Sequence, residues 1–285
     1  MIVLRRCKCE GHAHKPAPNK EKNVKHRILI TGASAGLGAA LAREYASRGW
    51  DLVLVARREE RLMALAKDLK STHGTDSKII AADLFSETAV PDLISALDGL
   101  QIDGLINNAG YGHPGTYLSS PWEDHRKFNH LMTVVPIELT HALLPQMVER
   151  GFGRIMQVAS LAGHLPGSKG HTLYAAVKAF LIKFSESLNA EMKGKGVHVS
   201  ALCPGFVLTE FHDVNGTRDG VSQLPNFMVM QADKCARLAA DALEADKDVF
   251  ISGRINRMLA RLNRFMPWLG KYLMGRSAAR YRKQD

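Results

Sequence analysis

Short apolar runs alternate with longer amphipathic segments along most of this chain. The apolar runs are residues 26–32, 51–58, 77–84, 103–110, 153–160, 196–205 and 248–253. Their length and their content of Val, Ile and Leu are typical of buried strands. Apolar residues recur at helical spacing up to residue 49 and over 59–72, 86–97, 122–149 and 172–193. The alternation predicts an α/β fold whose parallel sheet is covered by helices on both faces.

The same pattern predicts one domain rather than two. A chain of 285 residues is long enough for one large α/β domain or for two modest ones. No linker interrupts residues 25–253, so we predict a single domain there. We expect a basic N-terminal tail over residues 1–24 and a basic amphipathic helical extension over residues 254–285.

A glycine-rich turn joins the first predicted strand to the first predicted helix. It reads "TGASAGLG" over residues 31–38, with glycines at 32, 36 and 38. Glycines allow unusual backbone angles and let a pyrophosphate approach the N-terminus of the following helix. A glycine-rich turn alone is a weak signal, but its place at the first strand-to-helix junction of an alternating chain predicts a dinucleotide site.

Two arginines follow the second predicted strand, where dinucleotide-binding folds distinguish their cofactors. An acidic residue there binds the ribose hydroxyls of NAD, and an arginine accommodates the 2′-phosphate of NADP. This chain has Arg57 and Arg58 at that place. They could instead be the first residues of a solvent-exposed helix face. Because guanidinium groups match the geometry of phosphate, we favour NADP(H) over NAD(H).

Several short motifs in order resemble those of the short-chain dehydrogenase/reductase family. They are "TGASAGLG" (31–38), "AADL" (81–84), "NNAG" (107–110), Ser160, "YAAVK" (174–178) and "PGFVLT" (204–209). The resemblance runs from about residue 26 to 253 and is closest to ketoreductases and hydroxysteroid dehydrogenases. It implies a Rossmann-type doubly wound sheet that binds a dinucleotide and catalyses hydride transfer.

The resemblance also implies which residues bind the cofactor. Asp83 and Leu84 would face the adenine, and residues 108–110 would line the adenosine side. Lys178 would hydrogen-bond the nicotinamide ribose. The full expected set is Thr31, Gly32, Ser34, Gly36, Leu37, Gly38, Arg57, Arg58, Asp83, Leu84, Asn108, Ala109, Gly110, Tyr174, Lys178, Pro204, Gly205 and Thr209.

Tyr174 and Lys178 are the candidate catalytic pair. They are four residues apart, so on a helix their side chains lie on the same face. A free phenol has a pKa near ~10, which is too high for efficient proton exchange at neutral pH. A nearby positive charge favours the phenolate and lowers that pKa. We therefore expect Tyr174 to give its proton to a substrate carbonyl oxygen as hydride reaches the carbon.

Ser160 ends the fifth predicted strand, at the edge where open α/β sheets bind ligands. Its hydroxyl could donate a hydrogen bond to the developing oxyanion, or it could simply cap a turn. Its spacing to Tyr174 and Lys178 favours the catalytic interpretation. No G-x-S-x-G motif surrounds it, which argues against a serine hydrolase.

One position departs from the family pattern. The family commonly has an Asn in the helix before the strand that carries the serine, where it anchors a water-linked proton path through the lysine. In this chain that position is Met132, and Asn129 lies one helical turn earlier. Methionine cannot hydrogen-bond comparably. We expect the proton path to be affected and hydride transfer to persist.

Composition and charge exclude several function classes. The formal net charge is +10, but the ends, residues 1–27 and 254–285, carry +6 and +8, which leaves −4 for the body. A nucleic-acid enzyme would carry basic charge on its body, so we expect no nucleic-acid partner. No uncharged apolar stretch approaches the roughly 20 residues of a membrane span. The four cysteines form no disulfide framework, which favours a cytoplasmic protein.

The two ends of the chain contain a cluster of cysteines and histidines and a basic amphipathic segment. Cys7, Cys9, His12 and His14 are too tightly spaced for a stable zinc site, so we expect no metal and a mobile tail. Residues 255–273 carry apolar side chains at helical spacing with arginines between them, interrupted at Pro267. That stripe could pack over the substrate pocket, or it could contact a membrane surface or a partner.

Together these features predict an NADP(H)-dependent oxidoreductase that interconverts a hydrophobic ketone or aldehyde and its alcohol. Apolar residues within 206–230, namely Phe206, Phe211, Leu224, Phe227, Met228 and Met230, suit a bulky substrate or form the core of a lid. The alternative is a weakly active or inactive cofactor-binding protein that keeps the fold for interaction or membrane association. The resemblance implies a homodimer or homotetramer.

Overall fold

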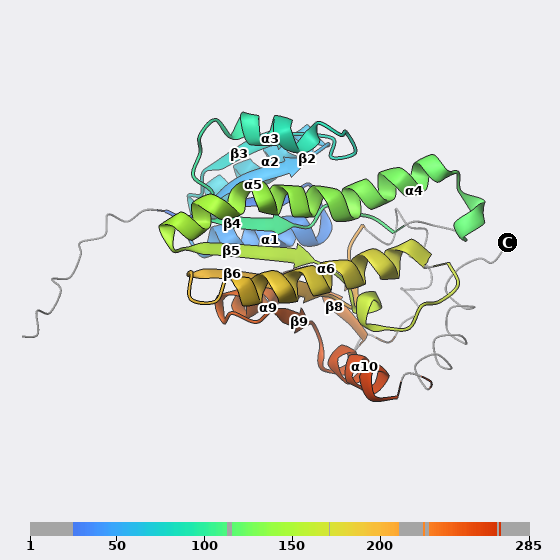
Figure 1. Cartoon of the computed structure of the whole chain (residues 1–285). Helices are drawn as coiled ribbons and strands as arrows, with labels where there is room; N and C mark the ends of the chain where they lie inside the picture. Colours follow the sequence, from blue (N-terminus) through green and yellow to red (C-terminus); the bar gives the residue numbers. More distant parts are fainter. Residues whose placement is uncertain are drawn as a thin grey trace, which may run out of the picture.

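A seven-stranded parallel sheet forms the centre of the molecule (Figure 1). The computed structural model describes residues 25–112, 116–170, 172–210, 225, 228–266 and 268. The strands are β1 (Arg27–Thr31), β2 (Asp51–Ala56), β3 (Ser77–Ala81), β4 (Gly104–Asn107), β5 (Gly153–Val158), β6 (Val197–Cys203) and β9 (Val249–Ile251). Their order in the sheet is β3-β2-β1-β4-β5-β6-β9. This is the Rossmann-type doubly wound sheet that the alternation and the resemblance predicted.

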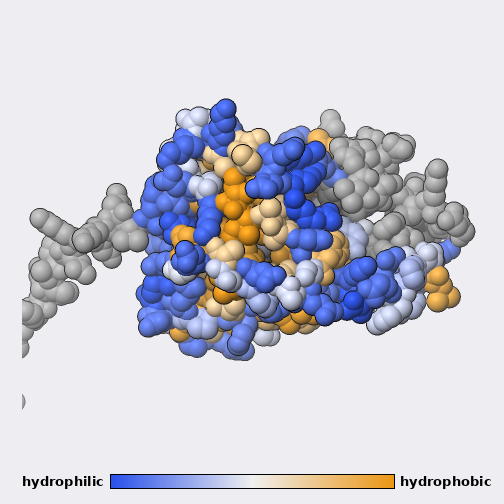
Figure 2. All heavy atoms as spheres, turned by 90° about the horizontal axis from the view of Figure 1, so that it is seen from above, coloured by the Kyte–Doolittle hydropathy of each residue, from blue (hydrophilic) through white to orange (hydrophobic). Residues whose placement is uncertain are grey.

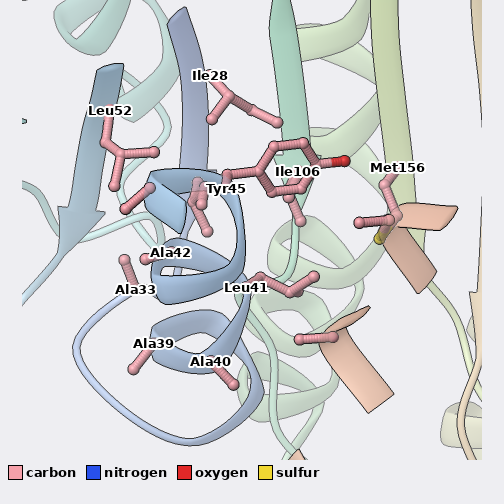
Figure 3. Close-up of a cluster of buried hydrophobic side chains, with 14 of the residues drawn as sticks. Ile28, Ala33, Ala39, Ala40, Leu41, Ala42, Tyr45, Leu52, Ile106 and Met156 are labelled. Carbon is pink, nitrogen blue, oxygen red and sulfur yellow. The ribbon is translucent and has the colours of Figure 1, made fainter. Parts of the chain in front are cut away.

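Helices cover both faces of the sheet, as the apolar strands require. One face packs against α1 (Gly36–Ser47), α2 (Glu59–His73) and α9 (Ala232–Glu244). The other packs against α3 (Ala89–Leu97), α5 (Val135–Arg150) and α6 (Thr172–Glu191). Figure 3 shows Leu41 and Tyr45 of α1 among Ile28 and Ile106 of the sheet, all fully buried.

The strand order places a crevice at the carboxyl ends of β1 and β4. The chain passes from β1 outward through β2 and β3, then returns to add β4 on the other side of β1. The connections after β1 and β4 therefore leave in opposite directions, and ligands of open α/β sheets bind at this switch point. Residues 31–38 and 107–110, which lie far apart in the sequence, meet there.

The edge strand β3 is half-buried on its outer side. It pairs with β2 alone in the described sheet, and four of its five residues are of intermediate exposure. Figure 2 looks onto the molecule from above, where β3 and α3 lie in Figure 1, and shows a band of hydrophobic residues with hydrophilic margins. Lys78 projects from this strand, a common protection of an edge against pairing with another sheet.

The structure differs from the predicted elements in three places. Residues 232–244 form α9, and residues 206–208 and 229–231 form the short strands β7 (Phe206–Leu208) and β8 (Val229–Gln231), none of which the periodicity identified. The predicted helix 122–149 consists of α4 (Trp122–Asn129), a π-helical turn over His130–Val134, and α5. Most predicted strands also extended past the observed ends, because the polar residues that follow each strand belong to the site.

Within the part of the chain that the structure describes, one helical stretch is long and apolar enough to cross a membrane by length and composition. It is Trp122–Arg150. Its apolar residues Val135, Leu139 and Leu143 pack against the sheet. Burial in the protein core therefore accounts for its composition.

Candidate active site

A cleft of about 1030 Å³ opens at the carboxyl edge of the sheet. Sixteen of the eighteen predicted cofactor residues line it, together with Ser160. These sixteen are Gly32, Ser34, Gly36, Leu37, Arg57, Arg58, Asp83, Leu84, Asn108, Ala109, Gly110, Tyr174, Lys178, Pro204, Gly205 and Thr209. The remaining two, Thr31 and Gly38, are the first and last residues of the glycine turn and do not line the cleft.

The glycines of the turn are required by its geometry. Gly32 and Gly36 have φ angles of +67° and +55°, a region that side chains disfavour. A Cβ on Gly38 would lie 2.3 Å from the carbonyl oxygen of Gly32. No side chain caps the N-terminus of α1, whose N-cap is Ala35. An uncapped helix N-terminus behind a bare backbone suits the negative charge of a pyrophosphate.

Thr31 and Asn108 join the two sides of the crevice. The Thr31 hydroxyl accepts hydrogen bonds from the backbone N–H groups of Asn108 and Ala109, each at 3.0 Å. The Asn108 amide donates to the carbonyl oxygens of Thr31 and Gly32 at 2.9 and 3.2 Å. These hydrogen bonds hold the glycine turn against the end of β4. Thr31 and Asn108 therefore fix the shape of the cleft, and Asn108 also lines it.

The predicted arginines lie at one end of the cleft. Arg58 donates to the Ser34 hydroxyl through Nε and Nη2 at 3.3 and 3.1 Å. The guanidinium carbon of Arg57 lies 5.6 Å from the ring centroid of Phe85, a cation–π contact. Two guanidinium groups and a hydroxyl thus gather where the second strand ends.

An acidic residue that the sequence analysis did not single out also reaches this end. Glu210, which follows β7, accepts from Arg58 at 3.2 Å and from Arg61 at 2.8 Å. The hydrogen bonds from Arg61 lower the pKa of the Glu210 carboxyl. No local sequence signal points to this contact, because Glu210 and Arg58 are joined by tertiary structure alone.

At the other end of the cleft, α6 presents the predicted pair. The Lys178 ammonium donates to the carbonyl oxygen of Val158 at 2.7 Å and lies 5.7 Å from the ring centroid of Tyr174. The lysine is buried, and burial lowers its pKa to about 8. Its charge is therefore present at neutral pH and is lost as the pH rises through that value.

Ser160 follows β5 and lies at the same end of the cleft. Its hydroxyl oxygen accepts a hydrogen bond of 3.1 Å from the backbone N–H of Ala162, so it caps the 3-10 turn η3 (Leu161–His164). The capping interpretation is therefore correct. It uses a lone pair of the oxygen and leaves the hydroxyl hydrogen for a second partner.

A buried cysteine lies behind the lysine. Cys203 ends β6 and is fully buried. Burial raises the pKa of its thiol, so the thiol stays neutral at physiological pH. Cys203 is therefore no nucleophile here.

Met132 lies inside the π-helical turn and is buried against Phe128 and Val177. Its sulfur lies 2.8 Å from where a Cβ on Gly110 would be, so it packs onto the cleft wall. Such turns are rare and are often found at functional sites. The structure gives Met132 an apolar packing role where the family commonly has an amide.

Replacing Met132 by Asn should therefore destabilise the protein. The change leaves a cavity and buries an amide among apolar side chains, so the free energy of unfolding should fall by about 2–4 kcal/mol. Urea denaturation followed by circular dichroism measures it. Met63→Asn, on the exposed face of α2, is the control and should change stability by less than about 0.5 kcal/mol. An equally small change at Met132 would show that the pocket already offers polar partners.

Several predictions fall outside the described residues. They concern the tail with Cys7, Cys9, His12 and His14, the apolar residues Phe211, Leu224 and Phe227, and residues 269–285. Within the described part of the chain, no group of three or more His, Cys, Asp or Glu residues could hold a metal ion.

Comparisons with known proteins agree with this geometry. The family profile described as short chain dehydrogenase matches residues 26–219, which is more than half of the 285 residues. The very-long-chain 3-oxoacyl-CoA reductase-B of Danio rerio is 37% identical over 192 residues, an alignment that covers 65% of this chain and 61% of that protein. The chain thus spans about three fifths of such relatives.

Two solved structures extend the similarity over more of the chain. A short-chain dehydrogenase from Sphingobium yanoikuyae in complex with NADPH is 32% identical, with a TM-score of 0.76, and the match covers 87% of this chain and 94% of that one. The bulky-bulky ketone specific alcohol dehydrogenase from Comamonas testosteroni is 29% identical, with a TM-score of 0.73 and coverage of 88% and 95%.

Proposed function

The chain belongs to the short-chain dehydrogenase family, and from that premise we propose that it interconverts a hydrophobic ketone or aldehyde and its alcohol with NADP(H). One observation carries the proposal. A single cleft has arginines and a bare helix N-terminus at one end and Ser160, Tyr174 and Lys178 at the other. A dinucleotide fits such a cleft because the adenosine with its 2′-phosphate and the reactive nicotinamide lie at opposite ends of NADP(H), with the pyrophosphate between them.

The cofactor is NADP(H) rather than NAD(H). Arg57, Arg58 and Ser34 would hold the 2′-phosphate, and the turn 31–38 would hold the pyrophosphate. Similar solved structures contain NADPH, including the short-chain dehydrogenase from Sphingobium yanoikuyae. Asp83 and Leu84 would face the adenine, while Pro204, Gly205 and Thr209 would hold the nicotinamide end. Bound NADPH supplies the hydride that reduces the carbonyl carbon.

Residues of the chain itself donate and accept the proton of the reaction. Tyr174 gives its phenolic proton to the carbonyl oxygen, which leaves an alcohol and a phenolate. Lys178 stabilises that phenolate by its charge. The Ser160 hydroxyl donates to the same oxygen while negative charge develops there. In the oxidative direction the phenolate removes the alcohol proton.

We assign a bulky hydrophobic carbonyl compound as the substrate. Val207 lines the cleft, and the partly buried Phe206 and Met230 lie on the neighbouring strands β7 and β8. The names of similar proteins, a very-long-chain 3-oxoacyl-CoA reductase and a bulky-bulky ketone specific alcohol dehydrogenase, support this class. We expect a homodimer or homotetramer, since relatives of this family assemble through their long helices.

The cofactor preference has a direct test in Arg58→Gln. Loss of charged hydrogen bonds to the 2′-phosphate should raise the KM for NADPH about 10–100-fold and leave the KM for NADH nearly unchanged. Initial rates with both cofactors measure it. Arg43→Gln, an exposed arginine on α1, is the matched control and should change neither KM. Equal effects on both cofactors would contradict the assignment.

Met132 favours a second candidate, a cofactor-binding protein with little turnover. Fluorescence titration with NADPH followed by absorbance assays on a panel of hydrophobic ketones separates the two. Binding with turnover supports the reductase. Tight NADPH binding without turnover across a broad panel would favour the second candidate.

A further inference from the structure

The helix α10 (Arg254–Phe265) faces the protein with its polar residues. Asn263 donates to the carbonyl oxygen of His164 at 2.7 Å, and its own amide oxygen is buried. Asn256 packs onto Gly205, where an added Cβ would lie 2.3 Å from its amide nitrogen. Ala260 between them is buried. Two amides and a methyl group thus take part in the contact with the body, and Arg257 donates to the carbonyl oxygen of Ile251 at 3.2 Å.

The largest apolar side chains of this segment point outward instead. Met258, Phe265 and Trp268 are 61%, 79% and 69% exposed. The expectation that the apolar stripe packs over the substrate pocket is therefore wrong for Met258 and Phe265. Exposure of large apolar side chains is unfavourable in water, and several of them exposed on one short segment mark an interaction surface.

The same outward surface is cationic. Arg254 and Arg261 are exposed beside Met258 and Phe265. Residues 254–268 contain four arginines and no Asp or Glu. Within the described part of the chain, this surface therefore combines aromatic and apolar side chains with unneutralised positive charge along one helix.

We propose that α10 docks on an anionic lipid surface. Phe and Trp side chains are favoured at the headgroup level of a bilayer, and arginines beside them pair with lipid phosphates. Charge complementarity selects this occupant over a second copy of the chain. A twofold contact through α10 would place the arginines of both copies against each other.

This docking deepens the proposed function and rests on it in one respect, the lipid-like character of the substrate. Asn263 joins α10 to η3, which begins directly after Ser160, and Asn256 touches Gly205 of the cleft. Figure 1 shows α10 at the end of the molecule to which the strands point. A docked α10 would therefore hold the cleft beside the membrane that dissolves a long-chain ketone.

Vesicle co-sedimentation of the full chain tests the docking. We expect binding to vesicles of phosphatidylcholine with phosphatidylserine and little binding to phosphatidylcholine alone. Arg254→Gln with Arg261→Gln should weaken binding about 30-fold, since each arginine near an anionic surface contributes on the order of fivefold. Met258→Ser with Phe265→Ser and Trp268→Ser should weaken it at least about tenfold.

Matched controls keep the result specific to α10. Met63→Ser, at 57% exposure on α2, and Arg43→Gln on α1 should leave vesicle binding unchanged. Vesicle binding that is unchanged by the α10 substitutions would overturn the proposal. So would α10 variants that change the mass measured by analytical ultracentrifugation and not the vesicle binding, since that result would assign the surface to a second copy.

A spectroscopic readout reports on Trp268 directly. Trp50 is buried, so in a Trp122→Phe protein the exposed tryptophan is Trp268. Brominated lipids in anionic vesicles should quench its emission. Absence of quenching under conditions where the protein sediments with vesicles would show that another part of the chain binds them, against the proposal.

The docking and the proposed function fail independently. The α10 variants should retain NADPH-dependent reduction of a water-soluble ketone, because none of the substituted residues lines the cleft. Tyr174→Phe should retain vesicle binding. The α10 variants should therefore lose vesicle binding and keep normal turnover. Variants of the catalytic residues should lose turnover and keep normal vesicle binding.

Discussion

Replacing Tyr174 by Phe should lower kcat/KM for ketone reduction by about 10³-fold. The change removes one hydroxyl, which is the proposed proton donor, and general acid catalysis contributes about 10²–10⁴-fold. The ring keeps its packing against the cluster of Phe128, Met132 and Val177, so the fold should be retained. Steady-state rates of NADPH oxidation with a hydrophobic ketone measure the effect.

Two accompanying measurements make this result specific. NADPH affinity, measured by fluorescence titration, should change by no more than a few-fold, since the pyrophosphate and the 2′-phosphate bind away from the Tyr174 hydroxyl. Tyr117→Phe, which removes the hydroxyl of an exposed tyrosine outside the cleft, should keep turnover within about twofold. Unchanged turnover in Tyr174→Phe would remove the mechanism proposed above.

Replacing Lys178 by Met should lower turnover by about 10²–10³-fold and shift the pH dependence of alcohol oxidation. Oxidation needs the phenolate, and a positive charge near the ring favours it. Without that charge, the rising limb of the oxidation profile should move about 1–3 pH units to the alkaline side. Rates with saturating NADP⁺ over a pH series show the shift. An acid-side shift would contradict the electrostatic role.

The stability of this variant provides a second signature. Burial lowers the pKa of Lys178 from 10.5 to about 8, so the folded protein binds fewer protons than the unfolded chain between those values. The contribution of Lys178 to stability should therefore rise with pH across that window, so the stability of the wild type relative to the Met variant should increase there. Denaturant titrations at several pH values compare the two. Lys67→Met, an exposed lysine on α2, should behave as the wild type.

Much of the fold could be predicted because local patterns carry it. The strands β1 to β6 and β9 are apolar runs, and apolar residues recur at helical spacing in the helices between them. The burial of each element can therefore be predicted from residues that are close together in the sequence. Most of the site residues were predicted from the resemblance to the short-chain dehydrogenase/reductase family. They follow strand ends, and the carboxyl ends of parallel strands meet at one edge.

Other features depend on contacts that no local pattern contains. Glu210 reaches Arg58 across 152 residues of sequence. The helix α9 was not predicted, although six of its residues are buried. The π-helical turn at Met132 likewise interrupts a segment whose sequence reads as one continuous helix.

Local sequence patterns account for the alternating elements, the glycine turn and the spacing that puts Tyr174 and Lys178 on one helical face. These are consequences of backbone geometry within a few residues. Tertiary structure alone decided that Asn256 and Asn263 of α10 turn inward while Met258 and Phe265 turn outward. A helix offers several faces, and the one that packs is chosen by the hydrogen-bond partners and space that the rest of the chain provides. Here the partner of Asn263 is the carbonyl oxygen of His164, and the absence of a side chain at Gly205 leaves space for Asn256.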